Sequence, residues 1–331
     1  MICGTRPSVM RRANLQISLA LLATAIAFAT ASPALAQQWP ARAIRIVTGT
    51  PAGGSPDIIS RLIGDKLAER LGQAIVVENS SVTGVAAWAS VAKSQPDGYL
   101  YSMLTGAFSA RAAVAKSLPY DAVRDFSFVT LVSGYPMVVA TAPGSSIKSF
   151  AEAIALAKTK NLLVGVNLPG SVHHLTCELI NVEGAIAMQP IHYRGNSQIL
   201  QDLLGGRLDL MVETGTTALG QIKAGVLRGL AVTSRERFAL EPDIPAVAET
   251  LPGFEVISWL GLAGPAGIAR PVIERFNRDV GEILKLSDIR DKLAGLGNVP
   301  TPSTPEAMLA YIERDIARWN RVVELKKIER Y

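Results

Sequence analysis

The sequence holds few of the residues on which metal, redox and disulfide chemistry depend. Its 331 residues include two cysteines and three histidines, and aromatic residues make up 6% of the chain. Cys3 lies near the start, so Cys177 is alone if the first segment is removed, and no disulfide can then form within the chain. The apolar periodicity around Cys177 indicates an amphipathic helix, which predicts a buried, unreactive thiol.

Motifs for nucleotides, metals and nucleophilic catalysis are also missing. No Gly-Lys-Ser/Thr follows the glycine-rich stretch 51–57, and Gly-x-Gly-x-x-Gly does not occur. His173 and His174 are adjacent, so on a helix their side chains point about 100° apart and cannot readily hold one ion. We therefore expect no metal, no cofactor and no catalysis. An exported serine-type hydrolase is the enzyme alternative, although Ser171 lacks the Gly-x-Ser-x-Gly surroundings of such a nucleophile.

Long apolar runs are confined to the start of the chain. The opening residues carry three arginines and no acid, an apolar run covers 15–31, and small residues lead up to Ala36. These are the three parts of a secretory signal peptide, which predicts a segment 1–36 cleaved after Ala36 and export to the periplasm. An uncleaved membrane anchor is the alternative, but the run is shorter than the roughly 20 residues that span a bilayer.

Charge is nearly balanced once this segment is set aside. Its removal leaves 30 basic and 28 acidic residues, a formal charge of +2 instead of +5. No block of basic residues remains, so nucleic acid is not an expected partner. We expect a soluble monomer, and the remaining 295 residues are enough for two lobes.

From residue 43 onward, short apolar runs alternate with helical periodicity. This alternation predicts parallel β-sheets with helices on both faces, and its two successive series indicate two lobes. Asp57 is expected to cap the first helix, which ends before Gly72. The predicted strands are 44–47, 74–77, 99–104, 128–131, 137–140, 162–166, 189–192, 208–212, 229–233 and 256–263. The further predicted helices are 85–93, 150–158, 172–181, 197–204, 219–224, 271–284, 288–296 and 305–323.

Three polar loops each follow a predicted strand and precede a predicted helix. They are 51–57, 167–174 and 213–217. Ligands of open parallel sheets lie at the carboxyl ends of the strands, so the loops should border one crevice. Glycines and helix N-termini in such loops favour an anion, and the scarcity of charged residues favours binding over catalysis.

A series of short motifs runs through nearly the whole chain. It includes Trp39-Pro40, Pro51-x-Gly53-Gly54-x-x-Asp57, Leu71-Gly72-Gln73, Pro96-Asp97-Gly98-Tyr99, Asp202-Leu203-Leu204-Gly205-Gly206 and Pro252-Gly253-Phe254-Glu255. In order and spacing, the series resembles the Bug-type receptors, the extracytoplasmic substrate-binding proteins of tripartite tricarboxylate transporters.

The resemblance implies a two-lobed α/β fold of the periplasmic binding protein type. Two mixed, mostly parallel sheets flanked by helices would be joined by a two-stranded hinge. Together with the strand pattern, it predicts a first lobe of 37–138 plus 258–331 and a second lobe of 139–257. It implies capture of a small aliphatic or aromatic carboxylate for transporter subunits in the membrane. A sensory receptor subunit of a membrane kinase is an alternative, because closure on a ligand would serve both.

The resemblance also nominates ligand-binding residues. In Bug-type receptors, the loops that match 51–57 and 170–174 hold a carboxylate through backbone N–H groups, hydroxyls and water. Carried over to this sequence, and with Tyr193 added, the candidates are Ala52, Gly53, Ser55, Asp57, Gly170, Ser171, Val172, His173 and Tyr193.

Departures from the family pattern fall in the same region. Glu213-Thr214 stands where the family usually has Asp-Asn, and Phe108 stands where small polar residues are common. Residues 80–84 lack the arginine and two glycines of the usual Arg-Pro-Gly-Ala-Gly-Gly. We expect Phe108, Glu213 and Thr214 to lie at the ligand, with Phe108 and Trp88 suited to an aromatic acid. The candidate loops hold few positive side chains, which leaves a neutral nitrogenous solute as a variant.

Overall fold

The computed structural model describes Met1, residues 39–80 and residues 84–331. The predicted signal segment and its cleavage site after Ala36 therefore lie outside the described residues. Residues 1–41 form a unit of their own, and the fold is that of residues 42–331. Within the described part of the chain, no helix has the length and apolar character needed to cross a membrane.

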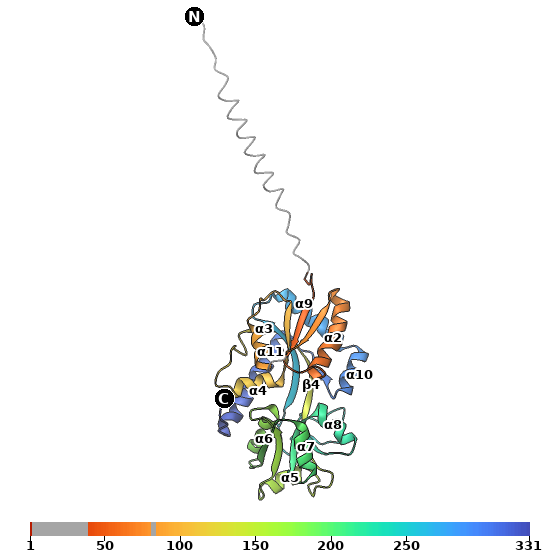
Figure 1. The fold of residues 1–331 in the computed structure, drawn as a ribbon, viewed down its shortest axis with the longest axis vertical. Helices are drawn as coiled ribbons and strands as arrows, with labels where there is room; N and C mark the ends of the chain where they lie inside the picture. The colour runs from red at the N-terminus through yellow and green to blue at the C-terminus, as the bar shows by residue number, and fades with distance from the viewer. Residues whose placement is uncertain (2–38, 81–83) are drawn as a thin grey trace. The chain divides into compact units, whose positions relative to one another are not determined.

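Strands and helices alternate along most of residues 42–331 (Figure 1). The strands are β1 (Ile44–Thr48), β2 (Ile75–Asn79), β3 (Leu100–Thr105), β4 (Phe126–Thr141), β5 (Leu163–Asn167), β6 (Gln189–Tyr193), β7 (Leu210–Thr214), β8 (Arg228–Val232), β9 (Ile257–Pro265) and β10 (Val299–Pro300). The helices are α2 (Ser55–Leu71), α3 (Gly84–Ala92), α4 (Gly106–Val114), α5 (Phe150–Ala157), α6 (Val172–Glu183), α7 (Asn196–Leu204), α8 (Gly215–Lys223), α9 (Arg270–Leu284), α10 (Ser287–Gly295) and α11 (Pro305–Leu325), with a short 3₁₀ turn at Val247–Glu249.

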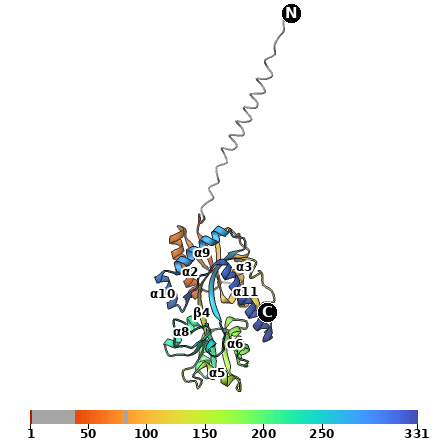
Figure 2. The ribbon, with the colours of Figure 1, turned by 180° about the vertical axis from the view of Figure 1, so that it is seen from behind.

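The strands form two groups, which share β4. In the first strand group, β1 pairs in parallel with β2 and β3, and β9 runs antiparallel to β3 and to the first part of β4. In the second strand group, β5 pairs in parallel with β6 and β7, and the last part of β4 runs antiparallel to β7 and β8. Both groups are therefore mixed. Helices α2, α3 and α9 lie around the first group, and α5 to α8 lie around the second (Figures 1 and 2).

Strand β4 carries the chain from the first group to the second without a break. Its pairing with β9 ends at Pro136, opposite Ile257, and its pairing with β7 begins at Met137. Two separate strands were predicted here, but they are one strand of 16 residues. Pro136 lies where one set of ladder hydrogen bonds gives way to the other, so its missing N–H interrupts neither.

The first helix begins earlier than predicted. Helix α2 starts at Ser55, its N-cap residue is Gly54, and a proline stands in its first turn. The prediction that Asp57 is the cap was therefore wrong. The Asp57 carboxylate instead accepts the N–H of Gly53 (2.8 Å) and an N–H of Arg61 (2.9 Å), which closes the turn before the helix.

One apolar cluster joins helices from both strand groups. It includes Ala110, Ala113 and Val114 of α4, residues of α6, and Trp319 and Val322 of α11. Helix α11 contacts α4, which follows β3 of the first strand group, and also α6 of the second. Cys177 belongs to the same cluster as a buried free thiol, and burial raises its pKa. This confirms the predicted burial of Cys177.

Asp315 in α11 is an acid buried within the fold. It is 2% exposed, and its Oδ2 accepts a hydrogen bond from Trp259 Nε1 (3.1 Å). Removal from water outweighs the nearby Arg318 and raises the pKa of Asp315 above its ordinary value. The charged form is thus disfavoured in the folded protein.

Asp315→Asn should change how stability depends on pH. Because the pKa of Asp315 is higher in the folded state, its contribution to stability is present at low pH and is lost as the pH rises through the raised pKa. The asparagine cannot titrate, so the free energy of unfolding of the wild type relative to the variant should fall as the pH rises above about 4, the ordinary pKa of an aspartate. Urea titrations across this range measure the difference, and parallel profiles would contradict it.

Candidate functional site

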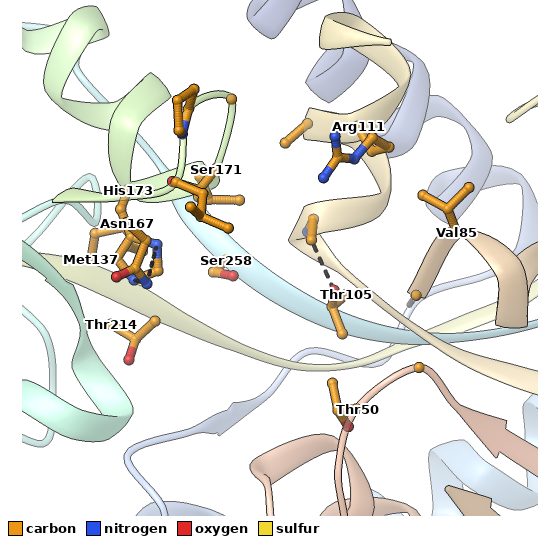
Figure 3. Close-up of a pocket in the computed structure, with 18 of the residues that line it drawn as sticks. Thr50, Val85, Thr105, Arg111, Met137, Asn167, Ser171, His173, Thr214 and Ser258 are labelled. Atoms are coloured by element: carbon orange, nitrogen blue, oxygen red, sulfur yellow. Dashed lines mark hydrogen bonds between the residues drawn. The ribbon is translucent and has the colours of Figure 1, made fainter. Parts of the chain in front are cut away.

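A cavity of about 400 Å³ lies where the strand ends of the two groups meet (Figure 3). The residues that line it lie at or just beyond the carboxyl ends of β1, β3, β5, β6 and β7, and in α3, which comes after β2. Others lie in the middle of β4 and at the start of β9. This is the position expected for a ligand in open α/β sheets, and the size is that of a small-molecule site.

Helix N-termini converge on the cavity. Among the described residues, the first turns or N-caps of four helices line it: Gly84 and Val85 of α3, Thr105 and Ala107 of α4, Ser171 to His173 of α6, and Thr214 before α8. Each helix N-terminus presents free N–H groups and the positive end of a helix dipole. The arrangement therefore favours an anion.

Two arginines add positive charge to the cavity wall. Arg111 projects from α4 and Arg194 follows β6, so the two come from different strand groups. Among the described residues, neither guanidinium forms a hydrogen bond or ion pair with a carboxylate, and no aspartate or glutamate lines the cavity. Figure 3 shows Arg111 on one side and His173, with Asn167 and Thr214, on another. Both arginines are thus available to an anionic ligand.

Sequence reasoning did not find these arginines. Helix α4 was not predicted, so Arg111 was not placed near a strand end, and Arg194 is one residue beyond the candidate Tyr193. The candidate loops do hold few positive side chains, as expected, but the cavity lining also includes these two arginines from other segments. The sequence did contain a signal for α4, namely Thr105, a residue type that caps helices. Its hydroxyl accepts the N–H of Ala107 (3.3 Å), and Arg111 lies in the second turn of the helix that it caps.

Five of the predicted residues come together at the cavity. They are Gly170, Ser171, Val172, His173 and Thr214. Ser171 is the N-cap of α6, and its hydroxyl accepts the N–H of His174 (3.2 Å). Its hydroxyl is thus used as a cap, and among the described residues no histidine ring is hydrogen-bonded to it.

The first candidate loop lies beside the cavity, and its predicted residues do not line it. Ala52, Gly53, Ser55 and Asp57 are absent from the described lining, where Gly49 and Thr50 stand instead. Gly49 lies against the start of α3, where a Cβ on it would lie 2.6 Å from Gly84 Cα. The glycine that admits the first loop to the site therefore precedes the Pro-x-Gly-Gly motif.

Phe108 is also placed elsewhere. Phe108 belongs to α4 and is fully buried. Its ring is stacked on Tyr120 (ring centroids 5.8 Å apart) and lies edge-on to Phe126 (5.2 Å) and Trp88 (5.3 Å). Trp88 does line the cavity. Phe108 thus packs against Trp88, and the Phe108 ring does not itself reach the cavity.

Tyr193 and Glu213 stand outside the lining as well. Tyr193 donates its hydroxyl to Asp202 (2.7 Å). Glu213 is 0% exposed; its Oε1 accepts the N–H of Thr214 (2.7 Å) and lies 3.4 Å from His173 Nε2. Glu213 is thus buried behind the cavity lining, where its carboxylate contacts and orients His173 and Thr214. The described residues contain no cluster of three or more metal-ligating side chains.

The loop between β5 and α6 is held in shape by two local features. Gly170 has φ of +69°, and its N–H donates to Nδ1 of His174 (3.0 Å). Burial, with the nearby His192, lowers the pKa of His174 to about 4, so the ring is neutral and can accept this bond. The lining residues Leu168 to His173 depend on this geometry.

Gly170→Ala should destabilise the protein more than Gly206→Ala. Both glycines have a left-handed φ, +69° and +71°, which costs an alanine about 1 kcal/mol or more. A Cβ at Gly170 would also lie 2.8 Å from Val114 Cγ2, whereas a Cβ at Gly206 meets nothing within 4 Å. Denaturant titrations should give an additional loss of about 1–3 kcal/mol for Gly170→Ala. Equal losses would contradict the crowding at this loop.

His174→Asn should remove a pH dependence of stability. The unfolded ring takes up a proton near pH 6.5 and the folded ring near 4, so the free energy of unfolding falls as the pH decreases through this window. The size of the loss is about 3 kcal/mol. Asparagine keeps an acceptor near Nδ1 without titrating, so the advantage of the wild type should shrink from pH 6.5 to 4 in thermal or urea unfolding. A constant difference would contradict it.

Comparison with known proteins identifies the family. The family model described as the tripartite tricarboxylate transporter family receptor matches residues 59–328. Protein BugT of Bordetella pertussis is 33% identical over 319 residues, which are 94% of this chain and 97% of that protein. A solved R. palustris protein with adipate is 29% identical with a TM-score of 0.76, covering 88% of this chain and 99% of the other. MatC from Rhodopseudomonas palustris, with bound malate, is 28% identical with a TM-score of 0.72, covering 86% and 100%.

These matches confirm two predictions. The shared fold along the matched structures confirms the two-lobed α/β fold of periplasmic binding proteins. The sequence matches confirm the resemblance to Bug-type receptors, whose members bind substrates and do not transform them. The chain belongs to the receptor family of the tripartite tricarboxylate transporters and is a solute-binding receptor, not an enzyme.

Proposed function

We propose that this receptor captures a small carboxylate in its cavity and delivers it to the membrane subunits of a tripartite tricarboxylate transporter. One observation carries the proposal: helix N-termini and two arginines, neither of them ion-paired among the described residues, converge on a cavity with no acid in its described lining. The neighbours solved with adipate and with malate support the ligand class.

Within this class, we favour an aliphatic acid with polar groups at both ends. Arg111 and Arg194 come from different strand groups, and apolar Val85, Met103 and Met137 also line the cavity. A ligand that contacts both arginines would bridge the two groups. The case for an aromatic acid is weaker than the sequence indicated, because Phe108 is packed in the core.

The bounds of the lobes and the export route are also proposals. Residues 37–138 plus 258–331 form the first lobe and 139–257 the second, supported by the change of pairing partner at Met137 and by the start of β9 at Ile257. A ligand that touches both lobes stabilises their closed arrangement by its differential contacts. Residues 1–36 direct the chain to the periplasm and are removed after Ala36, and the mature receptor works as a monomer.

Titration calorimetry with malate, adipate and benzoate tests the ligand class. We expect heat from at least one of the two aliphatic dicarboxylates and weaker or no binding of benzoate. Absence of binding to all three would contradict the proposal. Tighter binding of benzoate than of malate and adipate would indicate that the ligand is an aromatic acid.

Arg111→Gln should weaken binding of the dicarboxylate by at least about ten-fold, because it removes a charge-assisted hydrogen bond to the ligand. Arg290→Gln makes the same change of charge at an exposed position on α10 and should leave the affinity unchanged. Calorimetry on both variants separates a local contact from the general charge of the protein. Equal affinities for Arg111→Gln and the wild type would exclude Arg111 from the site.

A further inference from the structure

Tyr331 contacts the cavity wall from outside on two sides. Its backbone is fixed to the end of α4, where its N–H donates to Val114 O (3.0 Å) and its carbonyl accepts from Lys116 N–H (3.1 Å). These bonds set where the side chain can reach. Half of the residue surface is exposed, and the residue itself does not line the cavity.

The hydroxyl of Tyr331 holds the loop between β5 and α6. It donates a hydrogen bond to the carbonyl of Pro169 (2.5 Å), a residue of the cavity lining. The contact is close enough that a Cβ on Gly170 would lie 2.8 Å from the same hydroxyl. One residue anchored to α4, in the first strand group, is thus bonded to the ligand loop of the second.

The ring of Tyr331 lies against Arg111. The guanidinium carbon is 5.1 Å from the ring centroid, within the range of a cation–π contact. Arg111 forms no ion pair among the described residues, so this ring is the contact that the structure gives its charged group. The ring restricts a long, flexible side chain on the wall of the cavity.

We infer that Tyr331 is a positioning residue for ligand capture. Its hydroxyl fixes the loop that presents Gly170 to His173, and its ring fixes Arg111, so both are pre-organised before the ligand arrives. Pre-organisation strengthens binding because less freedom is lost when the complex forms. The inference rests on the proposed function for its effect on affinity, whereas the effect on the loop can be measured without ligand.

Amide hydrogen exchange of the ligand-free protein tests the hydroxyl. Tyr331→Phe removes only the bond to Pro169 O, so exchange at Gly170 and Ser171 should accelerate by roughly three- to ten-fold. Tyr99→Phe is the matched control, because it removes the same hydroxyl from a tyrosine whose ring also lies against a guanidinium, that of Arg42 (4.3 Å), and which does not line the cavity. It should leave exchange at Gly170 and Ser171 unchanged. Unaltered exchange in Tyr331→Phe would overturn the inference.

Calorimetry with malate and adipate tests the ring. Tyr331→Phe should weaken the tighter of the two by roughly three- to ten-fold, and Tyr331→Leu by a further two- to five-fold. In the Arg111→Gln background, the phenylalanine and leucine variants should bind equally, since the ring then has no guanidinium to orient. A difference that persists there would show a merely structural role and overturn the assignment.

The two proposals fail in different ways. If the wild type binds neither malate nor adipate, the proposed ligand class fails, and the exchange measurement still decides whether Tyr331 holds the loop. If the wild type binds and the Tyr331 variants bind equally well, the ligand class stands and the positioning role of Tyr331 is wrong.

Discussion

The hydrogen bonding of β4 changes partners between Pro136 and Met137, and the site depends on that change. Up to Pro136, β4 pairs within the first strand group, whose strands β2 and β3 lead into α3 and α4. From Met137 onward it pairs within the second strand group, whose strands β5 and β7 lead into α6 and α8. Strand β4, together with β9 that begins beside it at Ile257, therefore sets the distance and direction between the two sets of strand ends. Tyr135 and Met137, on either side of the change, line the cavity themselves. Neither strand group alone surrounds the cavity, so the cavity exists only because the two groups meet at this point.

The electrostatics of the junction come mostly from the backbone. Four of the helices among the described residues start at the cavity, and their N–H groups provide positive potential that needs no particular side chain. Arg111 and Arg194 add two positive side chains to the same wall. The carboxylate of Glu213 is fully buried, lies 3.4 Å from His173 Nε2 and accepts the N–H of Thr214, so it orients polar groups of the wall without being exposed itself.

Sequence reasoning located the strands and longer helices well, because apolar periodicity and turn residues act locally. It failed where long-range packing decides. Helix α4 was missed since its nine residues are apolar on most sides, and with it were missed the direction of Phe108 and the position of Arg111. The Pro-x-Gly-Gly motif predicted a loop that lies next to the cavity, although the residues in the lining are Gly49 and Thr50, just before the motif. The close approach of Gly49 to Gly84, 35 positions later in the chain, is a contact that local sequence patterns do not reveal, and Gly49 and Gly84 both line the cavity.

The apolar cluster shared by α4, α6 and α11 has a mechanical consequence. Separating the two strand groups along that side would expose buried surface such as Val114, Leu175 and Trp319, at a cost that grows with the apolar area brought into water. On the side of α8 and α10, Val299 of β10 packs against the apolar cluster of the second strand group, and a Cβ on Gly297 would lie 3.1 Å from Thr216 Cα. Contacts among the described residues therefore tie the two strand groups on both sides of β4, and a relative motion of the groups has to shift or break one of these contacts.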